Sequence, residues 1–181
     1  MSIHFNFEKT LQATGVLLEG DGGSMEYIRL LKLLYIADRT LLGEVGRTLT
    51  GDRAVAMDHG PVLCRVYDTI KGQTADAGRW AEFVHKDGYK VVLKKTPGRG
   101  KLSKREVALL NKLTEQYRNA TDWELVEETH EFGEWKANHR PGTSTPIPWP
   151  AALEAQGKSD RIAVADQEAR IVEAIDQLFG G

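Results

Sequence analysis

Apolar residues recur at helical spacing along much of the chain, and this pattern predicts a mainly helical fold. One face of a first helix, expected over residues 6–19, carries Phe7, Leu11, Gly15 and Leu18. The Gly-Asp-Gly-Gly run at 20–23 ends this helix, because glycine is a poor helix former. Ser24 is then expected to cap a second helix that runs to about Leu42.

The second helix is apolar on nearly every side. Its apolar positions are Tyr27, Ile28, Leu30, Leu31, Leu33, Leu34, Tyr35 and Ile36. The only polar positions expected to reach water are Arg29, Lys32, Asp38 and Arg39. A helix with so little polar surface is typical of the centre of a bundle, so we expect it to form the core.

Two further elements are predicted from turn residues. A third helix is expected to begin at Gly60-Pro61, with Pro61 at its first position, where the missing backbone N–H costs nothing. Residues 80–85 and 89–93 flank Asp87-Gly88, which is a strong signal for a β-hairpin. Because an isolated hairpin is only marginally stable, we expect it to pack on the helices.

The second half of the chain contains two capping boxes, Ser103–Glu106 and Thr121–Glu124, each of which predicts the start of a helix. Four prolines between Arg140 and Pro150 predict an extended stretch, so residues 137–150 form a proline-rich connecting segment. A last helix carries Ala165, Ala169, Val172, Ile175 and Phe179 on one face. The predicted fold is mainly α (α+β): one compact helical domain over residues 1–181 with a small β-hairpin packed on it.

Composition limits the function classes. With 41% hydrophobic and 28% charged residues and a net charge of −2, the chain is typical of soluble globular proteins. It lacks the excess of Lys and Arg usual in nucleic-acid-binding proteins. Cys64 is the only cysteine, which favours a reducing cytoplasm, and no apolar run approaches the ~20 residues needed to cross a membrane. We therefore expect a cytoplasmic protein with neither a membrane nor a nucleic-acid partner.

Metal chemistry is not expected. The run His130–Glu134 begins like a zinc-protease helix but places Glu134 where the second histidine ligand should be. The pair Glu82 and His85 lies in a predicted strand, where residues three apart point to opposite faces. We predict no metal and no cofactor.

A basic loop, residues 94–105, holds six basic residues and no acidic one. A Walker loop would need Gly at position 95 and Ser or Thr at 102, where Lys95 and Leu102 stand. A solvated connector is the favoured interpretation. The alternative, a small enzyme or a nucleotide- or nucleic-acid-binding regulator that uses this loop, stays open.

Four other residues are considered for chemistry or contact. Cys64 lies near the predicted start of the Pro61 helix, whose dipole would lower the pKa of the thiol, and His59 could act as its base. A lone cysteine among apolar residues is nevertheless usually a buried small hydrophobe. Trp123 lies on an apolar face that suggests a core position, whereas Trp149 between two prolines is expected to be exposed.

The chain resembles the Panacea domain of SocA-like antitoxins. The resemblance rests on the segment Leu-Lys-Leu-Leu-Tyr-Ile-Ala-Asp at 31–38, on Thr50-Gly51-Asp52, on Ala56 followed by Gly60-Pro61-Val62 and Tyr67, and on Thr129-His130 followed by Trp135. Met57 departs from the aromatic residue usual after the alanine. The expected structural signature residues are Leu33, Leu34, Tyr35, Ala37, Asp38, Ala56, Tyr67 and Trp135.

This resemblance implies binding rather than catalysis. Members are antitoxins of toxin–antitoxin pairs and phage-associated proteins, so the chain is expected to neutralise a protein toxin encoded nearby. Neutralisation would occur by direct contact or by delivery of the toxin to a ClpXP-type protease, and homo-oligomerisation stays open. The expected contact residues are His59, Gly60, Pro61, Val62, Lys94, Lys95, Arg99, Lys101 and Trp149.

Overall fold

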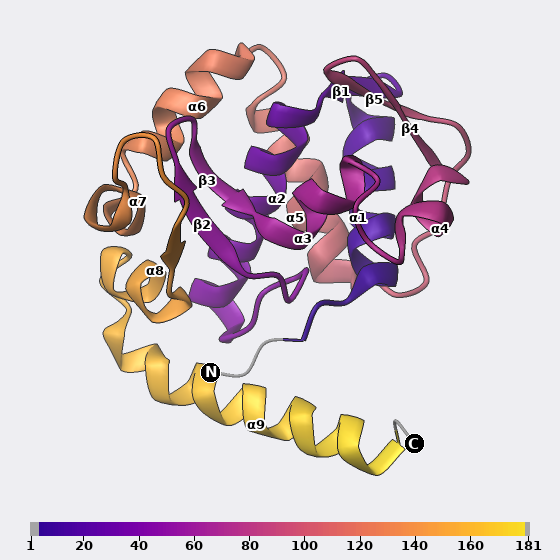
Figure 1. Cartoon of the computed structure of the whole chain (residues 1–181). Coiled ribbons are helices and arrows are strands. Elements are labelled where there is room, and N and C mark those ends of the chain that lie inside the picture. The colour runs from indigo at the N-terminus through magenta and orange to yellow at the C-terminus, as the bar shows by residue number, and fades with distance from the viewer. Residues whose placement is uncertain (1–3, 180–181) are drawn as a thin grey trace.

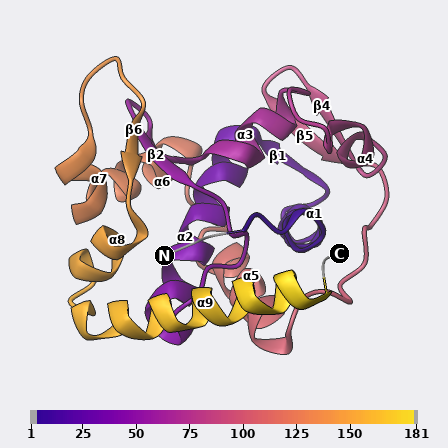
Figure 2. The same ribbon diagram turned by 60° about the horizontal axis from the view of Figure 1, so that its bottom comes forward.

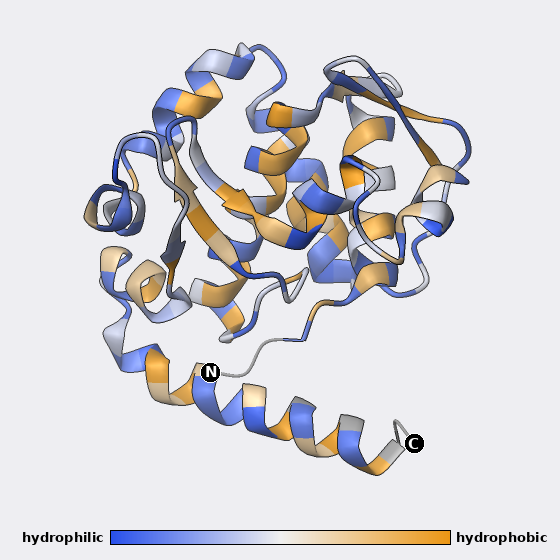
Figure 3. Cartoon of the chain, viewed as in Figure 1, coloured by the Kyte–Doolittle hydropathy of each residue, from blue (hydrophilic) through white to orange (hydrophobic). Residues whose placement is uncertain are grey.

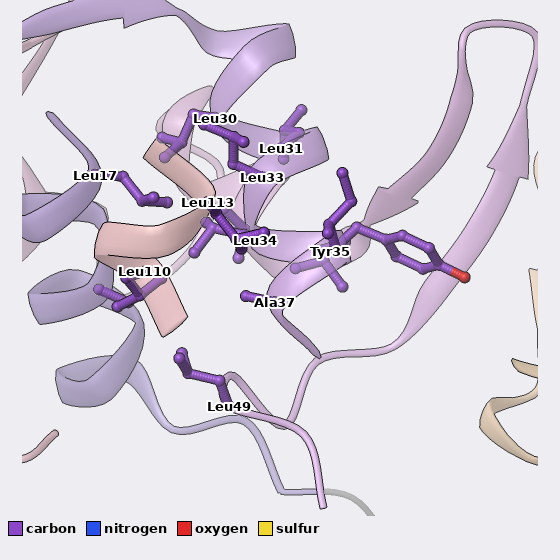
Figure 4. Packing of buried hydrophobic residues seen from close by; sticks show 14 of the residues in the cluster. Leu17, Leu30, Leu31, Leu33, Leu34, Tyr35, Ala37, Leu49, Leu110 and Leu113 are labelled. Atoms are coloured by element: carbon purple, nitrogen blue, oxygen red, sulfur yellow. The ribbon is translucent and has the colours of Figure 1, made fainter. Parts of the chain in front are cut away.

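Helix α2 (Tyr27–Val45) runs through the centre of the computed structural model, which describes residues 4–179 (Figure 1). Helices α1 (Phe7–Gly20), α5 (Lys104–Gln116) and α6 (Asp122–His130) pack around it. Leucines of all four helices belong to one buried cluster, which includes Leu125 of α6. Figure 4 shows part of it: Leu17, Leu30, Leu33, Leu34, Leu110 and Leu113. The expectation that this helix forms the core is confirmed.

Three of the four polar residues of α2 that were expected to reach water do not, because other segments of the chain cover them, whereas Arg39 is partly exposed. Arg29, Lys32 and Asp38 are all buried. The Asp38 carboxylate accepts hydrogen bonds from the backbone N–H groups of Leu49 (2.6 Å) and Thr50 (2.8 Å) and from the Thr50 hydroxyl. It thereby fixes the loop after α2, while burial raises the pKa of Asp38 to about 7.

A first sheet has the strand order β1-β5-β4. Ser24 does not cap α2, because Ser24–Glu26 forms β1 and pairs antiparallel with β5 (Lys90–Leu93). The predicted hairpin is present, with β4 at Val84–Asp87, but it is shorter than expected. The preceding residues fold into α4 (Ala77–Ala81), which buries Trp80 against the core.

The prediction of a helix at Gly60-Pro61 is wrong. Gly60–Leu63 is strand β3, and helix α3 (Cys64–Ile70) begins only afterwards. Strand β3 pairs with β2 (Ala54–Met57) through a two-residue turn, and Gly60 closes it at a φ of 90°. Since the strand order is β3-β2-β6, Pro61 lies on an edge strand, where its missing N–H leaves no ladder bond unmade.

The proline-rich segment is only partly extended. Helix α7 (Gly133–Asn138) ends inside it, and Thr145–Ile147 forms β6 on β2. Helix α8 (Trp149–Ala155) also begins inside it, with Pro150 in its first turn. Proline is compatible with a helix start, so the expectation that the whole stretch is non-helical is wrong at its end.

A 3₁₀ turn (Ser159–Arg161) leads into α9 (Ile162–Phe179), which extends along one side of the body in both views (Figures 1 and 2). Ala165 faces the core, but the hydropathy colouring of Figure 3 shows further apolar positions along this helix. Its exposed apolar residues are Val164, Ile171, Ile175 and Leu178. Of the residues predicted to share one face of this helix, Ala165 is buried and Ile175 is exposed.

Both capping boxes are present, with Ser103 and Thr121 each accepting from the N–H of the glutamate three residues on. The predicted fold class, mainly α with small antiparallel sheets, is confirmed. None of the helices within residues 4–179 combines the length and the apolar character that a bilayer crossing requires.

Candidate functional site

A groove with a volume of about 530 Å³ lies where the start of α2, the β4–β5 turn and the start of α6 come together, at the upper end of α2 in Figure 1. We call it the aromatic groove. Its lining residues are Glu26, Tyr27, Ile28, His59, Tyr89, Thr121, Asp122 and Trp123. Four separate parts of the chain therefore contribute to one surface.

Aromatic rings dominate this groove. The side chains of Tyr89 and Trp123 are 75% and 60% exposed, although large aromatic side chains normally bury most of their surface. The ring of Tyr27 lies 6.0 Å from that of Tyr89, and the ring of His59 meets Trp123 edge-on at 5.3 Å. A cluster of exposed aromatic rings around a hollow is typical of a binding surface.

Backbone contacts hold these rings in place. The N–H of Tyr27 donates to the carbonyl of Tyr89 over 2.8 Å and fastens the hairpin turn to the start of α2. His59 lies in the turn between β2 and β3. Trp123 is the second residue of α6, whose start is fixed by the Thr121 capping box. Turns and helix starts therefore place the rings of the groove beside one another.

A second hollow of about 390 Å³ adjoins the aromatic groove, with which it shares Tyr27, Ile28 and His59. Its other lining residues are Leu31, Lys32, Met57, Asp58, Val62, Tyr67, Gly142, Thr143 and Ser144. The Asp58 carboxylate accepts from the Gly142 N–H over 3.0 Å and contacts His139 Nε2 at 2.9 Å. The hydrogen bond with His139 lowers the pKa of Asp58, and together these contacts hold the loop at 142–144 against the β2–β3 turn.

Lys32 is the most unusual polar residue near the site. Its side chain is 1% exposed, and its ammonium donates to the Pro61 carbonyl over 2.8 Å. No carboxylate pairs with it among residues 4–179. Burial lowers the pKa of Lys32 to about 7, so the side chain changes its charge near neutral pH.

The motif Thr129-His130 followed by Trp135 forms a stack of aromatic rings. His130 and Trp135 stack at 4.1 Å, Trp135 and His139 at 4.4 Å, and the Trp135 indole donates to the Met57 carbonyl over 3.0 Å. Burial lowers the pKa of His130. Within the described part of the chain, no three His, Cys, Asp or Glu side chains gather as metal ligands would.

Glu134 stands where a zinc protease would have its second histidine ligand. In this protein it binds side chains of α2. It accepts from the Tyr35 hydroxyl over 3.0 Å and pairs with Arg39 over 2.6 Å. Figure 4 shows the Tyr35 ring pointing away from the labelled leucines. Glu134 therefore ties α7 to α2.

The basic loop lies on α1 and does not line the aromatic groove. Arg99 pairs with Glu19 at 2.5 Å, and the N–H of Lys101 donates to the side-chain carbonyl of Gln12 over 2.7 Å. Lys94 donates to a backbone carbonyl of α4, and Lys95 lies 4.0 Å from Glu82. These basic side chains are exposed and mostly paired, as in a solvated connector.

Cys64 begins α3, but burial raises the pKa of its thiol and the nearby Asp52 carboxylate adds to that effect. The prediction that the helix dipole would lower this pKa is therefore wrong. Desolvation outweighs the dipole because α3 is only 7 residues long and Asp52 caps it through the Arg65 and Val66 N–H groups. A thiol of this kind is a poor nucleophile.

The two tryptophans exchange the roles predicted for them. Trp149 is 3% exposed, donates to the Asp52 carbonyl over 3.0 Å and stacks on Tyr35 at 5.6 Å, so it cannot be a contact residue in the folded chain. Trp123 is the exposed one. Gly60, Pro61 and Val62 are also buried. His59 is exposed and lines both hollows, and Val62 lines the second.

Tyr89 and Trp123 were not predicted as contact residues. Each carries a local signal: Tyr89 follows Gly88 in the hairpin turn, and Trp123 lies in the first turn of a capped helix. Side chains at such positions tend to be solvent-accessible.

A family model described as the Panacea domain of SocA-like antitoxins matches residues 30–136, which is more than half of the 181 residues. The matched region runs from the first turn of α2 into α7 and includes His59, Tyr89 and Trp123. No curated protein and no solved structure matched the chain.

Proposed function

Because the chain belongs to the family of SocA-like antitoxins with a Panacea domain, we propose that it binds and neutralises a protein toxin through the aromatic groove. The observation that supports this site is the pair of exposed rings, Tyr89 and Trp123, on a hollow lined by few charges. Large aromatic side chains supply most of the binding energy in many protein interfaces. The protein acts in the cytoplasm as a binding partner and not as an enzyme.

The toxin is encoded next to this chain, and contact with it is the first step of neutralisation. In one mode the bound antitoxin covers the toxin's active surface. In the other it acts as an adaptor that delivers the toxin to a ClpXP-type protease. Both modes need the same binding surface, so the groove is tested first and the mode second.

The experiment is co-expression of this chain with the neighbouring open reading frame. We expect the protein encoded by that frame to be toxic when it is expressed alone and harmless when it is co-expressed with the wild-type chain. The double variant Tyr89→Ala/Trp123→Ala should lose the rescue, because both rings leave the groove. Leu178→Ala is the matched control, since it removes an exposed apolar side chain from α9, outside the groove.

Four outcomes separate the alternatives. Absence of rescue by the wild-type chain, with both proteins shown to be made, would contradict the antitoxin function. Rescue that persists in a host without ClpX indicates occlusion, and rescue lost there indicates delivery. Cys64→Ala should rescue like the wild type; its failure would favour the alternative of a cysteine-dependent enzyme.

A further inference from the structure

We propose that the aromatic groove binds an arginine side chain of the partner protein. The guanidinium would lie against the aromatic rings of the groove and pair with Glu26 and Asp122. The identity of the partner as a toxin rests on the proposed function, but the chemistry of the groove does not.

The charge of the lining selects a cation. Two carboxylates, Glu26 and Asp122, line the groove, and none of its lining residues is a lysine or arginine. Lys90 lies opposite Glu26 in the strand register, yet no ion pair joins Glu26 to any residue within 4–179. The Asp122 carboxylate forms an ion pair with the Arg29 guanidinium at 3.4 Å. An anion entering the groove would meet both carboxylates.

The rings supply the second half of the interaction. The faces of aromatic rings attract cations, and a guanidinium also stacks on them with its flat surface. The ammonium of Lys86 already lies 6.0 Å from the centre of the Tyr27 ring, at the outer limit of such contacts. Ile28 offers apolar surface in the same groove for the methylene stem of a long basic side chain.

The same arrangement occurs inside this protein. The guanidinium of Arg39 lies 4.2 Å from the centre of the Phe132 ring while it pairs with Glu134 at 2.6 Å. Ring and carboxylate therefore hold one arginine from two sides. Aromatic rings and carboxylates also line the aromatic groove, but none of its lining residues is an arginine.

The test is a titration of the full-length protein with a capped tripeptide, acetyl-Gly-Arg-Gly-amide. The control peptide carries citrulline, which keeps the shape of arginine but has no charge. Nuclear magnetic resonance would follow the indole N–H of Trp123, assigned with Trp123→Phe, and the backbone N–H of Tyr89. We expect saturable shifts at millimolar arginine peptide and much smaller ones with citrulline. Equal shifts with both peptides, or none with arginine, would overturn the proposal.

Glu26→Gln/Asp122→Asn keeps the shape of the groove and removes its charge. Each exposed charge pair is worth a factor of about two to five in affinity, so the double variant should weaken binding of the arginine peptide about four-fold or more. Glu115→Gln, an exposed carboxylate on α5, is the control and should change nothing. Unchanged affinity in the double variant, with its amide spectrum otherwise intact, would overturn the proposal.

The co-expression assay separates this inference from the function it rests on. If the wild-type chain rescues and the charge variant does not, the inference is supported. If the wild-type chain and the charge variant rescue equally while Tyr89→Ala/Trp123→Ala fails, the groove is the binding site but it does not bind an arginine. If the wild-type chain does not rescue, the antitoxin function fails, and the peptide titration alone decides the chemistry of the groove.

Discussion

The buried polar groups around α2 contact other segments of the chain. The exposed rings of the aromatic groove instead face solvent. Asp38, Asp52 and Glu134 lie in the interior and bind backbone N–H groups or side chains from distant segments. Tyr89 and Trp123 lie on the surface and show most of their area to solvent. The large pKa shifts of Lys32 and Asp38 fall in the first region. In this protein, a strongly shifted pKa marks a structural contact and an exposed ring marks the candidate site.

The sharpest test of this comparison uses two tryptophans. Trp149→Ala should lower the free energy of unfolding by about 4 kcal/mol, because it leaves a cavity beside Tyr35 and removes the hydrogen bond to Asp52. Trp123→Ala should lower it by less than about 1 kcal/mol, since its ring is mostly exposed. Urea unfolding followed by circular dichroism measures both. Similar losses in the two variants would contradict the comparison.

Asp38→Ala should cost about 3 kcal/mol of unfolding free energy, since it leaves the N–H groups of Leu49 and Thr50 without their acceptor inside the protein. The loop after α2 should then exchange its amide hydrogens faster, which hydrogen exchange resolves residue by residue. Glu115→Ala, on the surface of α5, is the control and should stay within about 0.5 kcal/mol of the wild type.

Lys32 predicts a pH dependence of stability. Its pKa falls from 10.5 in the unfolded chain to about 7 in the folded one. Between these values the unfolded state binds more protons, so the Lys32 contribution to stability rises with pH, by about 2 kcal/mol from pH 7.5 to 9. Well below pH 7 the lysine is protonated in both states, and its destabilising contribution becomes constant.

The matched variants for this effect are Lys32→Met and Lys112→Met, which remove a buried and an exposed lysine. The stability advantage of Lys32→Met over the wild type should shrink by about 2 kcal/mol between pH 7.5 and 9. For Lys112→Met the difference from the wild type should not vary with pH. A flat difference for Lys32→Met would show that burial does not shift this lysine.

The smallest expected change in stability concerns the groove itself. Tyr89→Ala should alter the free energy of unfolding by less than about 0.5 kcal/mol, because the ring is 75% exposed. Toxin binding in a pull-down should nevertheless drop markedly, since a ring of the groove is lost. A variant that loses stability and binding together would place Tyr89 in the core and not in the site.

Local sequence signals predict the longer helices well, but they predict the short helices and the groove poorly. The capping boxes at Ser103 and Thr121 act within three residues, so the chain itself specifies where those helices begin. Pro61 is compatible with a helix start or an edge strand, and its pairing with Ala56 decides between them. Trp149 is buried because Asp52, 97 residues earlier, accepts its indole N–H. No local pattern contains that contact.

Because local patterns contain no long-range contacts, the sequence predicts only part of the candidate site. His59 was predicted as a contact residue from its place beside the Gly60-Pro61 motif. Tyr27, Tyr89 and Trp123 are neighbours of His59 only after the hairpin and α6 dock on α2. Their spacing in the sequence carries no period that would connect them.

The backbone bond from Tyr27 to Tyr89 has a consequence for how such a protein could change its target. That bond joins an N–H and a carbonyl, so it forms whatever side chains these two residues carry. The Tyr89 side chain could therefore be exchanged without loss of this bond. New recognition properties can then accumulate by single substitutions on an unchanged scaffold, which is the kind of adaptability that an antitoxin needs when it acquires a different toxin as its neighbour.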